Sequence, residues 1–87
     1  EERRLVSFIR KTPTGRNYML VVCNFTPVAR PDYRVGVPKK KQYKLVLNEQ
    51  GLLEKGKIFK AEKQNCDNRD FSFAYPLEPY GVGVFTY

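Results

Sequence analysis

The sequence has 87 residues, which suffices for one small domain and not for two. Hydrophobic residues make up 41% of it and aromatic residues 14%, so it is not a disordered chain, and no apolar run approaches the roughly 20 residues that cross a bilayer. The net charge of +7 raises nucleic acid as a partner, but the basic residues are spread along the whole length.

Four charged residues, 1–4, precede the first predicted strand at 5–10. A short Pro and Gly loop at 13–17 then predicts a hairpin turn back into a long apolar strand that begins at Tyr18. That strand is rich in β-branched and aromatic residues, and prolines follow it at the irregular connection 26–32. We therefore expect the first two strands to pair.

The long strand is apolar on both of its faces. Leu20 and Val22 fall on one face, whereas Met19, Val21 and Cys23 fall on the other. A strand of this kind is covered on both sides. A domain this small covers one side with its own second sheet, so we expect something further, such as another domain, to cover the second side.

The remaining chain predicts several more short strands separated by turn signals. Residues 42–48 place Tyr43, Leu45 and Leu47 inward by alternation, and residues 49–56 read as a loop with room for one helical turn. The pattern favours an all-β fold, an antiparallel β-sandwich of about seven to eight short strands. The other predicted strands are 33–37, a charged edge strand at 57–63, 71–77 with Phe71, Phe73, Tyr75 and Leu77 on one face, and 80–87.

The residues that usually carry catalysis or hold metals are scarce. The chain has no histidine, and its serines, Ser7 and Ser72, both fall inside predicted strands. The polar segment 64–70 contains Asp67 and Asp70, but its spacing does not match a calcium loop, and turn chemistry explains it. We therefore expect no catalytic residue, no metal site and no cofactor in this chain.

The two cysteines, Cys23 and Cys66, lack the spacing of a metal site. We read Cys23 as a buried reduced thiol within the apolar strand, which favours a reducing compartment and a cytoplasmic protein. Asn24-Phe25-Thr26 matches a glycosylation sequon, but we set it aside because it lies at the end of a buried strand.

Two blocks carry a family resemblance, Val-Val-Cys-Asn-Phe-Thr-Pro-Val at 21–28 and Pro-Asp-Tyr-Arg-Val-Gly-Val-Pro at 31–38. With Tyr-Lys-Leu-Val-Leu-Asn at 43–48 and Tyr-Pro-Leu-Glu-Pro at 75–79, they resemble the C-terminal domain of 1,4-α-glucan (glycogen) branching enzymes of the α-amylase superfamily. The resemblance implies that residues 1–87 are a single C-terminal β-sandwich domain of a longer multidomain enzyme.

The resemblance also implies a function and a partner. The domain would pack on an upstream (β/α)₈ catalytic barrel of the same chain, which transfers α-1,4-glucan segments to α-1,6 branches in glycogen biosynthesis. The family's catalytic carboxylates lie on that barrel, so none is carried over to this chain. Contact with α-glucan is a further expectation, whereas a membrane partner is not expected.

The expected contacts with glucan and with the catalytic barrel suggest candidate contact residues. Tyr18, Tyr80 and Tyr87 are candidates for contact with glucan or with the neighbouring domain, because sugar rings stack on aromatic side chains, and Met19 and Val21 are candidates on the second apolar face. The competing reading makes each tyrosine a core or interface residue, and we expect the isolated domain to bind glucan weakly or not at all. An alternative function is a small basic β-barrel that binds nucleic acid through Lys39, Lys40, Lys41 and its aromatic residues.

Overall fold

The computed structural model describes residues 5–11, 13, 15, 17–53, 56–66 and 68–87. These residues form an all-β domain, as predicted, and among them no helix is long and apolar enough to cross a membrane. The strands in chain order are β1 (Leu5–Lys11), β2 (Tyr18–Asn24), β3 (Arg34–Val37), β4 (Gln42–Asn48), β5 (Gly51–Leu52), β6 (Ile58–Lys60), β7 (Phe71–Ala74) and β8 (Val82–Thr86).

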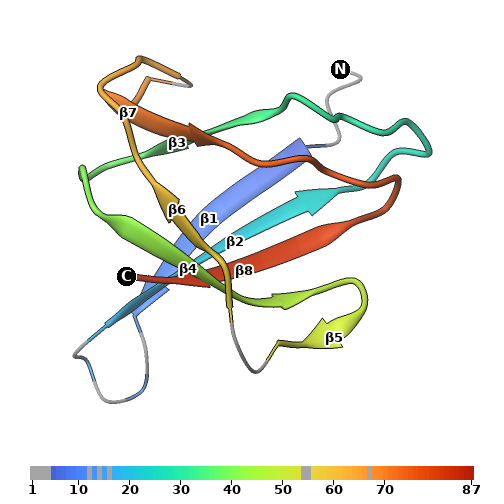
Figure 1. The fold of residues 1–87 in the computed structure, drawn as a ribbon, viewed down its shortest axis with the longest axis horizontal. Coiled ribbons are helices and arrows are strands. Elements are labelled where there is room, and N and C mark those ends of the chain that lie inside the picture. Colours follow the sequence, from blue (N-terminus) through green and yellow to red (C-terminus); the bar gives the residue numbers. More distant parts are fainter. Residues whose placement is uncertain (1–4, 12, 14, 16, 54–55, 67) are drawn as a thin grey trace.

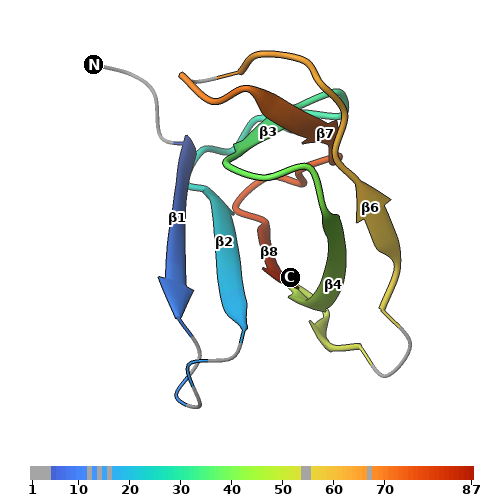
Figure 2. The same cartoon turned by 90° about the vertical axis from the view of Figure 1, so that its left-hand side faces the viewer.

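The strands form two antiparallel sheets (Figure 1). The larger sheet runs in the order β1-β2-β8-β4-β5, with β6 also pairing with β4, and the smaller sheet consists of β3 and β7. Figure 2 shows that the larger sheet is strongly curved from β1 round to β6, and that β3 and β7 lie together at its upper end. The N-terminal strand β1 is therefore an edge of the larger sheet, next to β2.

The predicted hairpin of the first two strands is confirmed. β1 pairs with β2 over its whole length, from Leu5 opposite Asn24 to Lys11 opposite Tyr18. β2 pairs on its other side with β8, so it lies in the interior of the larger sheet. Leu20 and Val22 point inward and are completely buried, which confirms the inner face predicted for β2.

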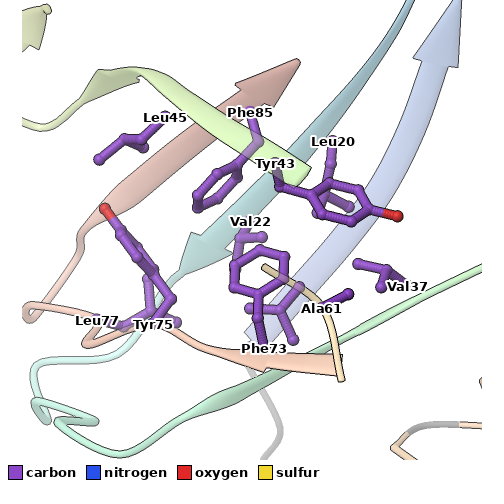
Figure 3. Close-up of a cluster of buried hydrophobic side chains, with 11 residues drawn as sticks. Leu20, Val22, Val37, Tyr43, Leu45, Ala61, Phe73, Tyr75, Leu77 and Phe85 are labelled. Carbon is purple, nitrogen blue, oxygen red and sulfur yellow. The ribbon is translucent and has the colours of Figure 1, made fainter. Parts of the chain in front are cut away.

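The core lies between the two sheets and is dominated by aromatic rings (Figure 3). Phe73 of β7 packs against Phe85 of β8 with ring centroids 5.1 Å apart, and Tyr75 approaches Phe85 at the same separation. Phe73, Tyr75 and Leu77 are all buried, as the alternation in 71–77 predicts. Such edge-to-face rings contribute beyond the area that they bury, so this cluster joins the small sheet to the large one.

The structure corrects the prediction for Leu47. The register between β4 and β8 shifts between Leu45 and Leu47, so Leu45 lies opposite Phe85 whereas Leu47 lies opposite Val84. A β-bulge inserts an extra residue and reverses which side chains face inward beyond it. Leu45 is therefore buried and Leu47 belongs to the opposite side of the sheet, where it is only partly buried.

The segment after β4 also differs from its prediction. Gly51 and Leu52 form the short strand β5, which pairs with the end of β4, and no helical turn occurs among the described residues of this loop. Gly51 has a φ of 116°, which glycine adopts without strain, and this allows the chain to reverse directly after Asn48. The edge strand predicted at 57–63 is shorter in the structure: β6 pairs with β4, and Glu62 then forms an isolated bridge to Ser72 of β7.

The buried Tyr43 makes the stability of the domain depend on pH in the alkaline range. Its ring is buried beside Phe73 and its hydroxyl donates to the Lys39 carbonyl oxygen at 2.7 Å. Burial, with the neighbouring Tyr87, raises the pKa of Tyr43 to about 12 from an ordinary value of 10.0. A raised pKa favours the neutral side chain in the folded state, so its contribution is complete below pH 10.0 and disappears as the pH rises towards about 12.

We therefore expect the free energy of unfolding to fall steadily across this alkaline range. Urea unfolding followed at increasing pH measures it, with the Tyr43→Phe variant as the control that should show a shallower decline. A stability that stays constant up to pH 12 in the unmodified chain would contradict the assignment.

Candidate functional site

The side of β1, β2 and β8 that faces away from the core forms a nearly continuous apolar surface, which we call the outer face. The registers align its residues in three rows across the strands, because side chains opposite one another in a sheet share a face. The rows are Val6, Cys23 and Val82; then Phe8, Val21 and Val84; then Arg10, Met19 and Thr86.

The outer face is only partly covered by the chain itself. Val6 is 41% exposed and Phe8 is 39% exposed, whereas Met19 and Val21 are half-buried between neighbouring strands. The Arg10 guanidinium lies 5.6 Å from the centre of the Phe8 ring and adds the one charge of the nine outer-face residues. An apolar surface of this kind, with a polar border, is typical of an interaction site.

Cys23 lies on the middle strand of the outer face, in the row of Val6 and Val82, and its thiol is unreactive. Burial raises the pKa of its thiol, so the thiol remains protonated at neutral pH. It forms no disulfide with Cys66, since both cysteines are reduced in the structure. Cys23 therefore acts as a small apolar side chain of the outer face.

Tyr18 and Tyr87 lie together at one end of the core instead of projecting outward. Their rings stack with centroids 5.6 Å apart, and Tyr87 also contacts Tyr43 at 4.5 Å. The Lys11 ammonium lies 5.9 Å from the centre of the Tyr18 ring. Both tyrosines are half-buried, so their rings close the end of the sandwich and leave little free surface for a sugar.

Tyr80 has the opposite environment. It is 65% exposed on the loop that leads into β8, and its backbone has a φ of 53°, in the left-handed region. Phe25, on the loop that follows β2, is 55% exposed and was not selected from the sequence. The two residues lie on adjoining loops, because the register of β2 and β8 ends with Cys23 opposite Val82 and the Tyr80 nitrogen then donates to the Thr26 carbonyl oxygen at 2.9 Å.

A single buried side chain holds these two loops together. The Asn24 amide nitrogen donates to the carbonyl oxygens of Val28 at 2.8 Å and Glu78 at 3.0 Å. Its amide oxygen accepts from the Thr26 backbone at 3.0 Å and from the Thr26 hydroxyl at 2.7 Å. Asn24 is 1% exposed and uses the full hydrogen-bonding capacity of its carboxamide.

We predict that Asn24→Ala lowers the free energy of unfolding by about 2–3 kcal/mol, because it leaves polar groups of both loops without their partners. Asn24→Asp should destabilise at least as strongly, since it retains the size but loses both donated hydrogen bonds and buries a charge. Chemical unfolding of both variants measures this. The exposed Asn65→Ala is the control, and an Asn24→Ala variant as stable as this control would refute the assignment.

Ser72 and Arg34 are occupied in structural contacts. The Ser72 hydroxyl accepts from Arg34 Nε at 2.9 Å and donates to the Gln64 carbonyl oxygen at 2.9 Å, so it is not placed as a nucleophile. Arg34 also forms an ion pair with Glu62 at 3.1 Å. Asp67 lies outside the described residues, and among those described no group of three His, Cys, Asp or Glu could hold a metal ion.

Comparison with known proteins decides the family. The model of the α-amylase C-terminal all-β domain matches residues 1–87, the whole chain. The chain belongs to this family. The resemblance inferred from the sequence is thereby confirmed, together with the all-β architecture.

Relatives of the domain are bacterial 1,4-α-glucan branching enzymes. The enzyme of Halothermothrix orenii is 37% identical in an alignment 92 residues long, which covers 97% of this chain and 14% of that protein. The Aquifex aeolicus enzyme is 39% identical, covering 93% of the chain and 14% of the relative, and that of Cereibacter sphaeroides is 44% identical, covering 98% and 12%. The domain thus spans about 12–14% of the length of these curated relatives. Nothing in these relatives supports the nucleic-acid alternative.

Proposed function

We propose that this chain is the non-catalytic C-terminal domain of a 1,4-α-glucan branching enzyme, and that it packs on the catalytic part of the same protein. Branching enzymes that match over 93% or more of the chain support the activity of the parent protein. We assign the domain a structural role, in which the Ser72 hydroxyl is engaged in hydrogen bonds and Cys23 in packing.

The exposed apolar outer face is the observation that supports docking of the domain on the catalytic part. Val6 and Phe8 lie on β1, the first strand of the domain, so a catalytic part that precedes the domain in the same chain would be joined to it beside this face. An upstream (β/α)₈ barrel would present its own surface to β1, β2 and β8. Covering Phe8, Val21 and Val84 would remove apolar area from water, at roughly 25 cal/mol per Å².

The cellular location is part of the proposal. The reduced cysteines Cys23 and Cys66 are compatible with a reducing compartment. A cytoplasmic enzyme of glycogen biosynthesis fits this observation.

The test of the proposed function is branch formation by the full-length protein that contains this domain. The purified protein is incubated with linear α-1,4-glucan, and new α-1,6 linkages are measured from anomeric proton signals and from chain lengths after debranching. New α-1,6 linkages are the expected result. A full-length protein that only shortens the glucan, or leaves it unchanged, would refute the proposal.

A further inference from the structure

We propose that Phe25 and Tyr80 form a binding platform for the sugar rings of an α-1,4-glucan, at the end of the domain where β2 leaves and β8 begins. This inference rests on the proposed function for the presence of the glucan, and it goes beyond it by assigning a site. We call these two residues the loop-end aromatic pair. The inference adds Phe25, and it separates Tyr80 from Tyr18 and Tyr87, whose rings close the core.

Phe25 and Tyr80 lie on adjoining stretches of backbone. The Asn24 backbone nitrogen donates to the Gly81 carbonyl oxygen at 2.9 Å, and the Tyr80 nitrogen donates to the Thr26 carbonyl oxygen at 2.9 Å. Phe25 lies between the two residues that make these bonds, so its backbone is adjacent to that of Tyr80. With exposures of 55% and 65%, both rings reach solvent from neighbouring backbones.

Hydrogen bonds hold the two loops that carry Phe25 and Tyr80 rigidly together. Asn24 ties the Phe25 loop to the Glu78 loop through its carboxamide, and the Gly81 nitrogen donates to the Glu78 carbonyl oxygen at 2.8 Å. Loops held in this way lose little conformational freedom when a ligand binds. A platform that is ordered in advance therefore spends less of its interaction energy on ordering.

A β-turn holds the backbone of Tyr80 in place. Pro79 precedes Tyr80, and the Gly81 nitrogen donates to the Glu78 carbonyl oxygen at 2.8 Å, so Tyr80 is the third residue of the turn. Its φ of 53° has the positive sign that this position has in type II turns. The turn therefore fixes the backbone from which the exposed Tyr80 ring projects.

The ligand class follows from the chemistry of the two side chains. Phe25 and Tyr80 offer aromatic faces without charge, and the Tyr80 hydroxyl adds a donor and acceptor. The apolar face of a neutral glucose ring stacks on such surfaces, and its hydroxyl groups hydrogen-bond at the rim. Two rings bind one sugar segment weakly, but they add to the retention of a long glucan that the same protein also holds elsewhere.

The test uses the full-length protein and glycogen as the probe. Affinity electrophoresis in gels of increasing glycogen concentration gives a dissociation constant for the unmodified protein and for the Phe25→Ala/Tyr80→Ala double variant. We expect roughly tenfold weaker binding in the double variant and about threefold in each single variant. Leu52→Ala is the matched control, since it removes a 79% exposed apolar side chain from β5 and should leave the dissociation constant unchanged.

A second pair of variants separates loss of the ring from damage to the fold. Tyr80→Gly and Tyr80→Ala both remove the ring, but only glycine relieves the left-handed backbone, so the glycine variant should unfold at the higher temperature. Both should bind glycogen equally weakly. Binding that tracks the unfolding temperature instead would overturn the platform.

The outcomes also separate this inference from the proposed function. Unchanged glycogen binding in the double variant, with branch formation by the unmodified protein, overturns the platform and leaves the proposed function in place. Weakened binding together with an unmodified protein that forms no α-1,6 linkages supports the platform and refutes the proposed function.

Discussion

In the full-length protein, Phe8→Asp should weaken docking of the domain by about 3–5 kcal/mol, because it replaces a ring of the covered apolar contact with a carboxylate that loses its water, even with Arg10 beside it. Phe8 is in the middle row of the outer face, opposite Val21, and is 39% exposed in the domain itself. Most of the ring is already covered within the domain, so the isolated domain is also destabilised, and the loss of docking is the additional effect in the full-length protein. Calorimetry of the full-length variant should show the domain unfolding as a separate transition at lower temperature than in the unmodified protein.

Val28→Asp is the matched control for this prediction. Val28 is 53% exposed on the connection that follows β2, outside the strands of the outer face, so a carboxylate there should leave unfolding unchanged. If Phe8→Asp and Val28→Asp gave the same calorimetric trace, the outer face would not be the docking surface.

Phe85→Ala should lower the free energy of unfolding of the domain by about 3–5 kcal/mol. The Phe85 ring is completely buried, and it contacts the rings of Phe73, Tyr75 and Phe59 at centroid distances of 5.1, 5.1 and 5.7 Å. Its removal leaves a cavity at the point where the small sheet meets the large one. A loss of this size is a large fraction of the stability of a small domain.

Urea unfolding of the Phe85→Ala variant measures this loss, and Phe25→Ala provides the control. The same side chain is removed from a site that is 55% exposed, so we expect a change within about 0.5 kcal/mol. Equal effects of the two substitutions would show that the aromatic cluster does not hold the sheets together.

The strands themselves could be predicted because their burial follows a simple period. Phe73, Tyr75 and Leu77 alternate with polar or smaller residues, and the structure buries all three. The two-sided apolar pattern of β2 likewise predicted the outer face. Met19 and Val21 are indeed not among the residues that line the core. Local periodicity is sufficient wherever a strand keeps a regular register.

Other features depend on contacts that periodicity does not contain. The bulge in β4 reverses the direction of Leu47, and nothing in the alternation of residues 42–48 marks its position. The central role of Asn24 arises from Glu78, which is distant in the sequence. A partial signal was present, because an Asn followed two residues later by Thr favours a side-chain turn of the kind that Thr26 completes.

The candidate contact residues were separated only by the three-dimensional arrangement. Tyr18, Tyr80 and Tyr87 are chemically equivalent in the sequence, yet Tyr18 and Tyr87 stack on each other and Tyr80 is left exposed. Phe25 was overlooked because it follows an apolar strand and resembles its continuation. Its exposure results from the end of β2 at Asn24, where the side-chain hydrogen bonds redirect the chain.

The central claim is that the catalytic part of the same protein covers the outer face, and hydroxyl-radical footprinting of the full-length protein tests it most directly. Phe8 and Phe25 are the same residue type and are 39% and 55% exposed in the domain, so their oxidation rates form an internal comparison. If the outer face is covered, Phe8 and Met19 are strongly protected from oxidation in the full-length protein while Phe25 remains reactive. Oxidation of Phe8 at a rate similar to that of Phe25 would contradict it.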